Sequence, residues 1–160
     1  MIIEIRFTDN LYMELKRKFR QKSMTSTVVY EGDLRTVNTH LQSSSRIETD
    51  APTDNQGKGE RFSPTDLLAT SLANCMLTTM GIRVKDRGID LKGIKVEVEK
   101  IMKPDPRRVA GIKLKYHIPR NLASIAENEK EFLRQVAENC PVAKSIHPDI
   151  EVTIDWGDWC

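Results

Sequence analysis

Two cysteines lie in sequence settings so different that together they could work as a redox pair. Cys75 lies within the long apolar segment 64–80, whereas Cys140 is followed at once by Pro141. A buried thiol and a thiol at the start of a helix differ in access and in pKa. This asymmetry suits a pair that reduces peroxides, in which the oxidant attacks one sulfur and the other sulfur resolves the product. The alternative is that both are small core residues, since unpaired cysteine is among the most buried residue types.

The electrostatic surroundings expected for the two thiols also differ. Cys75 lies three helical turns beyond the expected N-cap at Ser63, where the helix dipole no longer acts, and burial alone would raise its pKa. A cation from another element would have to activate Cys75. Arg35 is the strongest candidate, because it interrupts a strand that otherwise packs on the core; its alternative is a surface ion pair with a neighbouring acid. Cys140 is expected to face unpaired backbone N–H groups, which favour its thiolate.

Other kinds of site are not indicated. The long separation of Cys75 from Cys140 excludes a Cys-x-x-Cys redox motif and a finger-like zinc site. The three histidines are scattered, so no metal is expected. Cys160 is expected to be incidental or to form adventitious intermolecular disulfides. The sequence has neither a phosphate-binding glycine loop nor a Gly-x-Ser-x-Gly nucleophile elbow.

Composition limits the class of protein. A length of 160 residues, with 39% hydrophobic and 30% charged residues, suits one globular domain. A net charge of +2 provides no general attraction to nucleic acid or membranes, and the basic run at residues 16–22 is typical of a solvated helix face. The odd number of cysteines, the lack of a signal-peptide pattern and the lack of a long apolar run predict a cytoplasmic protein without a membrane span.

The segments that must position the cysteines follow an α+β pattern with antiparallel strands. Loose alternation predicts strands at residues 26–40 and 44–49, followed by the longest loop at 50–59. The helix that carries Cys75 has clear start signals, with Pro64 at its first position and Asp66 as a capping-box acid, and it is expected to end near Gly88. Because it is apolar nearly all round, burial on all sides is expected, either inside a domain or between subunits.

The second half of the chain shows the cleanest patterning. Apolar and polar residues alternate over 94–98 and 110–118, which predicts a hairpin with one wet face and one dry face. A helix is expected over 122–138, ending just before Cys140, and a short helix over 141–146 follows. A last alternating strand is expected at 151–156. Strands, helix, hairpin, helix and strand together indicate an α+β fold with antiparallel sheets packed on a long central helix.

Several of these segments resemble one known family. The stretches are Leu34–Thr36, Thr49–Pro52, Gly57–Met76 and the Cys-Pro-Val at 140–142. They resemble the OsmC/Ohr family of osmotically inducible and organic hydroperoxide resistance proteins. The resemblance runs from about Met24 to Trp156, so residues 24–160 are expected to form an OsmC-like domain. Residues 1–23 are then an N-terminal extension, and Met24 is an alternative start.

The resemblance implies a structure and an activity. Family members form intertwined homodimers with central cysteine helices and active sites at the subunit interface, and they reduce organic hydroperoxides with two cysteines. By this resemblance Cys75 is the peroxidatic cysteine that becomes a sulfenic acid, Cys140 is the resolving cysteine, and Arg35 stabilises the thiolate. No bound cofactor is implied. The Ohr branch is recycled by lipoylated proteins, so an external dithiol such as a lipoyl group or dihydrolipoamide is the expected reductant.

One position departs from the family pattern. Peroxidases of the family carry a glutamate ten residues before the first cysteine, and this glutamate holds the arginine; here the position is Thr65. The nearest acids that could support the arginine are Glu60 and Asp66, although Asp66 could instead cap its own helix. Two functions are therefore expected: a thiol peroxidase of oxidative stress defence, or a non-catalytic protein of the same fold that binds small molecules or responds to redox change.

Overall fold

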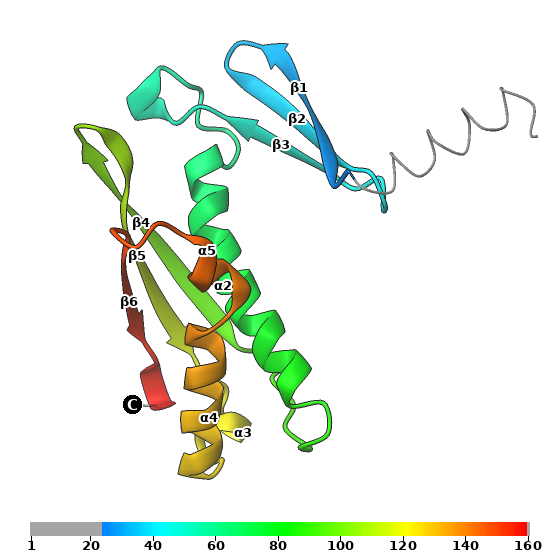
Figure 1. Cartoon of the computed structure of the whole chain (residues 1–160), viewed down its shortest axis with the longest axis vertical. Helices are drawn as coiled ribbons and strands as arrows, with labels where there is room; N and C mark the ends of the chain where they lie inside the picture. Colours follow the sequence, from blue (N-terminus) through cyan, green and yellow to red (C-terminus); the bar gives the residue numbers. More distant parts are fainter. Residues whose placement is uncertain (1–23, 160) are drawn as a thin grey trace, which may run out of the picture. The chain divides into compact units, whose positions relative to one another are not determined.

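A computed structural model describes residues 24–159 of the chain (Figure 1). The chain divides into two compact units, Met1–Pro64 and Thr65–Cys160, of which residues 24–64 and 65–159 are described. The predictions made for residues 1–23, including the basic run at 16–22, and for Cys160 lie outside the described residues. None of the described helices is long and apolar enough to cross a membrane.

The first unit contains a three-stranded antiparallel sheet in the order β1-β2-β3. Its elements are β1 (Ser26–Gly32), β2 (Arg35–His40), β3 (Arg46–Asp50) and the short 3-10 helix η1 (Thr53–Asn55). The strand predicted over 26–40 is in fact two strands, because Asp33 and Leu34 adopt φ of 48° and 62° and form a tight turn. This turn joins β1 to β2 and pairs Gly32 with Arg35. On the other side of β2, the pairing with β3 places Arg35 opposite Asp50 and Thr36 opposite Thr49.

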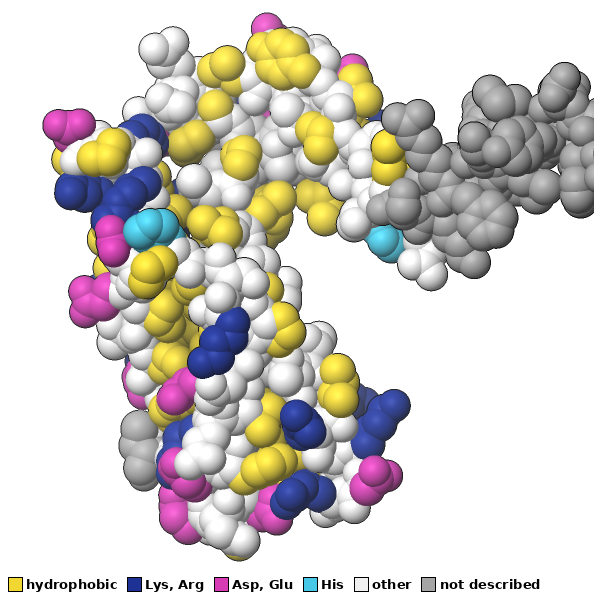
Figure 2. Space-filling model, in the orientation of Figure 1, with side chains coloured by type: hydrophobic (Ala, Val, Ile, Leu, Met, Phe, Trp, Pro, Cys, Tyr) yellow, Lys and Arg dark blue, Asp and Glu magenta, His cyan; other side chains and the backbone are white. Residues whose placement is uncertain are grey.

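This sheet leaves apolar side chains on its surface. Val28, Val29 and Tyr30 of β1 are 63%, 53% and 64% exposed. Neighbouring residues of a strand point to opposite faces, so β1 carries exposed apolar side chains on both of its faces. Within the described part of this unit, Val37 is the one buried hydrophobic side chain, and Figure 2 shows hydrophobic side chains on the surface of the unit. The described part of this unit therefore does not bury the sheet by itself.

The second unit holds the hydrophobic core. Its elements are α2 (Pro64–Arg83), β4 (Lys95–Pro104), β5 (Arg107–His117), α3 (Arg120–Ala123), α4 (Glu127–Glu138), α5 (Pro141–Ser145), β6 (Glu151–Asp155) and the 3-10 helix η2 (Gly157–Trp159). The strands form a sheet in the order β4-β5-β6. The predicted alternation holds along β5, where Ile112, Leu114 and Tyr116 are buried while Lys113 and Lys115 are exposed. The predicted wet and dry faces are therefore present.

Helix α2 buries one stripe of side chains rather than its whole surface. The buried residues recur every three or four positions and are Ala69, Leu72, Ala73, Met76 and Met80. This spacing lines up one face of a helix. Leu68 and Ile82 are 38% and 66% exposed. Burial on all sides inside one domain, which was one of the two expected settings, therefore does not occur in the single chain.

Two elements of the second unit differ from the sequence prediction. The helix predicted over 122–138 is divided into α3 and α4, and the acids Glu127 and Glu129 occupy the first turn of α4, where the helix dipole favours negative charge. Strand β6 runs parallel to β5, whereas an antiparallel arrangement was expected. A parallel pair needs a long crossover connection, which α3, α4 and α5 provide.

Candidate redox site

The residues predicted to form the site fall in two different units. Cys75 and Cys140 belong to the second unit, as do Thr65 and Asp66, whereas Arg35 and Glu60 belong to the first. In the described part of the chain, no three His, Cys, Asp or Glu side chains gather closely enough to hold a metal ion.

The fold brings the two thiols together. Cys75 lies midway along α2 and is half-buried, while Cys140 is the N-cap of α5, with extended backbone angles and no exposed surface. Each thiol acts on the pKa of the other, and Thr79 Oγ1 lies 3.9 Å from Cys75 Sγ. Both cysteines are unpaired. The geometry therefore offers one accessible thiol in contact with one enclosed thiol.

The expected order of the two thiol pKa values is reversed. Burial acts to raise the pKa of Cys75, but hydrogen bonds from the backbone N–H of Val142, from the Cys140 thiol and from Thr79 together lower it below its ordinary value. Burial raises the pKa of Cys140; the backbone N–H of Ala143 opposes this increase, and Cys75 adds to it. The backbone N–H groups at the start of α5 act on both thiols: that of Val142 is the largest effect that lowers the pKa of Cys75, and those of Ala143 and Val142 oppose the increase at Cys140.

Buried aromatic residues lie next to the thiol pair. Tyr116 is 1% exposed, donates its hydroxyl hydrogen to Met76 Sδ at 3.5 Å, and stacks on Trp156 with ring centroids 4.4 Å apart. Burial, and then negative charge at Cys140, raise the pKa of Tyr116, so its hydroxyl stays protonated. The sequence patterns placed Tyr116 and Met76 on buried faces, but no sequence signal placed them beside the thiols.

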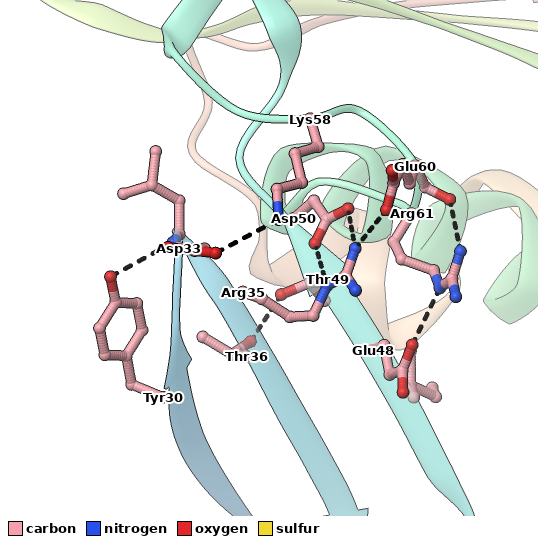
Figure 3. A network of polar contacts seen from close by, with 12 residues as sticks. Tyr30, Asp33, Arg35, Thr36, Glu48, Thr49, Asp50, Lys58, Glu60 and Arg61 are labelled. Carbon is pink, nitrogen blue, oxygen red and sulfur yellow. Dashed lines mark hydrogen bonds and ion pairs between the residues drawn. The ribbon is translucent and has the colours of Figure 1, made fainter.

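In the first unit, Arg35 is held by two carboxylates (Figure 3). Its Nε lies 2.7 Å from Asp50 Oδ1 and its Nη2 lies 2.9 Å from Asp50 Oδ2. The same Nη2 lies 2.7 Å from Glu60 Oε2. Asp50 is 3% exposed and the Glu60 side chain is 56% exposed. Asp33, an acid close to Arg35 in the sequence, pairs with Lys58.

Asp50 is the partner that sequence reasoning missed. It had been assigned to the start of the loop 50–59, where aspartate is a common turn residue. The structure extends β3 to Asp50, and the cross-strand register then sets it opposite Arg35. Opposite charges at such positions are a usual source of sheet stability, so a strand assignment one residue longer would have suggested this pair.

Thr65 and Asp66 interact with a lysine. Lys100 on β4 donates to Thr65 Oγ1 at 2.9 Å, and its Nζ lies 2.7 Å from Asp66 Oδ1. The Lys100 side chain is 16% exposed, so this is a partly buried contact between the first turn of α2 and the sheet. Of the three residues suggested to support Arg35, Glu60 lies in the same unit and contacts it.

Alkylation at pH 7 is expected to modify Cys75 at least about 10²-fold faster than Cys140, because a larger share of Cys75 is thiolate and its sulfur is easier to reach. Cys75 is the more accessible thiol and its pKa is lowered, whereas Cys140 is enclosed and its pKa is raised. Because the thiolate is the nucleophile, the Cys75 rate should rise with pH until the pKa is passed and then level off. Timed iodoacetamide labelling between pH 5 and 9, read by peptide mass spectrometry, measures both rates, and faster labelling of Cys140 would contradict this assignment.

Comparisons with known proteins identify relatives of the chain. Residues 57–155 match the family model described as OsmC-like protein. No curated protein matches the chain significantly by sequence. A crystal structure from Psychrobacter arcticus 273-4 is of a protein whose name links it to osmotic stress induction and the detoxification response. It is 52% identical, with a TM-score of 0.78 over 82% of this chain and 94% of that chain.

More distant structures share the fold. A Legionella pneumophila protein named an organic hydroperoxide resistance protein OsmC is 21% identical, with a TM-score of 0.61 over 83% of this chain and 96% of that chain. A Vibrio cholerae protein, named for organic hydroperoxide resistance and crystallised with captopril in one active site, is 17% identical. Its TM-score is 0.62 over 83% of this chain and 91% of that chain. The predicted α+β fold is therefore confirmed.

Proposed function

Because the chain belongs to the OsmC-like protein family, we propose that it is a thiol-dependent peroxidase that reduces organic hydroperoxides in defence against oxidative stress. The observation that carries this proposal is the contact between Cys75, whose pKa is lowered, and the enclosed thiol of Cys140. Peroxide reduction needs a reactive thiolate and a second thiol close enough to close a disulfide before further oxidation.

In the proposed cycle the Cys75 thiolate attacks the terminal oxygen of the hydroperoxide. The O–O bond breaks, the alkoxide leaves and takes up a proton as the alcohol, and Cys75 becomes a sulfenic acid. Cys140 then loses its proton and attacks the Cys75 sulfur, which releases water and forms the disulfide. An external dithiol reduces this disulfide by thiol exchange and becomes a disulfide itself, so no bound cofactor takes part.

Arg35 is the proposed stabiliser of the Cys75 thiolate, in the role that the family resemblance assigns to it. A guanidinium near a thiolate favours the charged form and lowers its pKa. We propose a homodimer as the active form, which the exposed apolar residues of β1 and the exposed Ile82 of α2 support, since a second copy would cover them. Light scattering after size exclusion should give twice the mass of the chain.

The proposed disulfide cycle also indicates which reductant recycles the protein and in which compartment the protein works. The disulfide of this cycle must be reopened at every turnover, which requires a supply of dithiols such as a lipoyl group or dihydrolipoamide. The cytoplasm keeps thiols reduced, and we propose that the protein works there. Turnover with dihydrolipoamide but not with buffer alone would support this assignment.

Mass spectrometry of peroxide-treated protein tests the proposal. One equivalent of cumene hydroperoxide should convert the two free thiols of Cys75 and Cys140 into one intramolecular disulfide. This change is visible as a loss of two hydrogens and as a cross-linked peptide pair. The control is a known thiol peroxidase in the same buffer. Unmodified Cys75 and Cys140, with the control fully oxidised, would contradict the proposal.

The alternative considered from sequence was a binding protein that keeps the fold without turnover. Its motivation was Thr65 in the position of the family glutamate, which left Arg35 without an assigned carboxylate. Asp50 and Glu60 supply two carboxylates to Arg35, so this reason no longer favours the alternative. Unreactive cysteines together with a co-purified small molecule would favour the binding protein over the peroxidase.

A further inference from the structure

The side chain of Arg35 has one fixed contact and one exposed contact. Arg35 and Asp50 are partners in the backbone register of β2 and β3, so the sheet itself sets their separation. Two nitrogens of the guanidinium meet the two oxygens of Asp50, at 2.7 and 2.9 Å. Such a bidentate pair defines the plane of the guanidinium as well as its position. In the next register position, the hydroxyls of Thr36 and Thr49 lie 2.6 Å apart.

Asp50 is itself held from several sides. Its backbone N–H donates to the carbonyl oxygen of Phe62 at 3.2 Å, which ties the end of β3 to the segment before α2. The Arg35 guanidinium is the largest cause that lowers the pKa of Asp50, and the backbone N–H of Glu60 lowers it further. The carboxylate therefore stays ionised until the pH falls below its ordinary range, and Arg35 keeps this partner at every physiological pH.

Glu60 makes a weaker kind of contact. It reaches Arg35 because the loop before it folds back tightly: Gly57 donates its N–H to Pro52 at 3.0 Å, and a Cβ at Gly57 would lie 1.7 Å from the Ala51 carbonyl oxygen. The Glu60 side chain is 56% exposed and uses one oxygen on Arg35. Exposed ion pairs contribute little and exchange easily, whereas breaking an enclosed pair is costly.

We propose that Asp50 is the positioning residue for Arg35, that Glu60 is a subordinate second partner, and that this pair replaces the glutamate missing at Thr65. This inference rests on the proposed function, because it concerns how Arg35 is aimed at the thiolate. Asp50 acts through Arg35 and touches neither peroxide nor sulfur. What matters is the position of its carboxylate, and a negative charge near Arg35 is not sufficient.

The test separates position from charge with two variants of Asp50. Asp50→Glu keeps the charge and displaces the carboxylate by one methylene, while Asp50→Asn removes the charge. Both should lower the alkylation rate of Cys75 at pH 7 about tenfold, because a guanidinium that is no longer aimed at the thiolate stabilises its charge less. Glu60→Gln should lower the rate less than about threefold, as expected for an exposed pair. Glu48→Gln is the matched control on the same strand, since Glu48 pairs with Arg61, and it should leave the rate unchanged.

The readout is the pH profile of Cys75 labelling, taken on variants whose circular dichroism matches the parent protein. A role confined to folding would not move this profile. Wild-type reactivity in Asp50→Glu overturns the inference, as does a rise in reactivity in Asp50→Asn, which would mean that freeing the arginine charge matters more than aiming it. If Asp50→Asn does not fold, Asp50→Glu decides the question alone.

Arg35→Lys separates the failure of this inference from the failure of the proposed function. Lysine keeps a positive charge but lacks the planar fork that pairs with Asp50. If Arg35→Lys leaves the Cys75 pH profile unchanged, the proposed role of Arg35 fails. If Arg35→Lys raises the pKa of Cys75 while the Asp50 variants behave as wild type, only the positioning role of Asp50 is overturned.

Discussion

Cys75→Ser is expected to lower kcat/KM for cumene hydroperoxide by at least about 10³-fold, the scale of loss found when a covalent nucleophile is removed. Serine has almost the same shape as cysteine, but its hydroxyl is not ionised near neutral pH and cannot form a sulfenic acid. The hydrogen bonds that lower the pKa of Cys75, from Val142 and Thr79, would then act on a group that has no thiolate to stabilise. Stopped-flow peroxide consumption with dihydrolipoamide as reductant measures the change.

Cys140→Ser is the matched control for this experiment. It keeps the attacking thiol and removes only the resolving step, so it should consume about one equivalent of peroxide in a burst and then stop. Trapping with dimedone should label Cys75 in this variant, because its sulfenic acid has no partner thiol. Peroxide consumption by Cys75→Ser at the wild-type rate would rule out Cys75 as the attacking group. A normal turnover rate in Cys140→Ser would rule out Cys140 as the resolving thiol.

Trp159→Ala is expected to destabilise the protein by about 3–5 kcal/mol, the usual range for removing a large aromatic side chain from a core. Trp159 has no exposed surface and is among the largest fully buried side chains of the described residues. Its indole N–H donates to the carbonyl oxygen of Leu122 at 2.9 Å, and its own carbonyl oxygen accepts a hydrogen bond from Arg134. The alanine variant would leave a cavity next to α3 and would remove one of the hydrogen bonds that the Leu122 carbonyl accepts.

Trp159→Phe is the control that separates packing from hydrogen bonding. Phenylalanine retains most of the buried area but cannot donate to Leu122, whose carbonyl keeps its backbone donors, so it should cost about 0.5–1.5 kcal/mol, the net contribution of one hydrogen bond. Urea unfolding followed by circular dichroism gives both values. Equal losses in the two variants would show that the hydrogen bond, and not the filled volume, accounts for the contribution of Trp159.

Much of the local structure could be predicted from patterns of residues. The N-terminal signals at Pro64 and the apolar run after it predicted the start of α2, and the alternation over 110–118 predicted β5 with its buried face. Cys140 followed by Pro141 predicted the N-cap of α5, which the structure has. These features depend on backbone conformations that neighbouring residues favour, so a single segment carries the information.

The direction of strand β6 and the breaks within the predicted helices and strands were predicted less well. The alternation of β6 gave no sign that it runs parallel to β5, because side chains alternate equally in both kinds of sheet. The break between α3 and α4 and the turn at Asp33 and Leu34 were also missed. In each case the choice depends on how the connection packs against the rest of its unit.

From the sequence by itself, most of the helices and strands, the two cysteines of the candidate site and the family of the chain could be predicted. Only the tertiary structure shows which groups lower the pKa of Cys75 and which carboxylates hold Arg35. The sequence suggested Arg35 as the group that would activate Cys75, whereas the backbone N–H of Val142 in the first turn of α5 is the largest effect that lowers its pKa here. Asp50 meets Arg35 through the register of β2 and β3. Hydrogen bonds act over about 3 Å, and no pattern along one segment specifies which distant group comes within that distance.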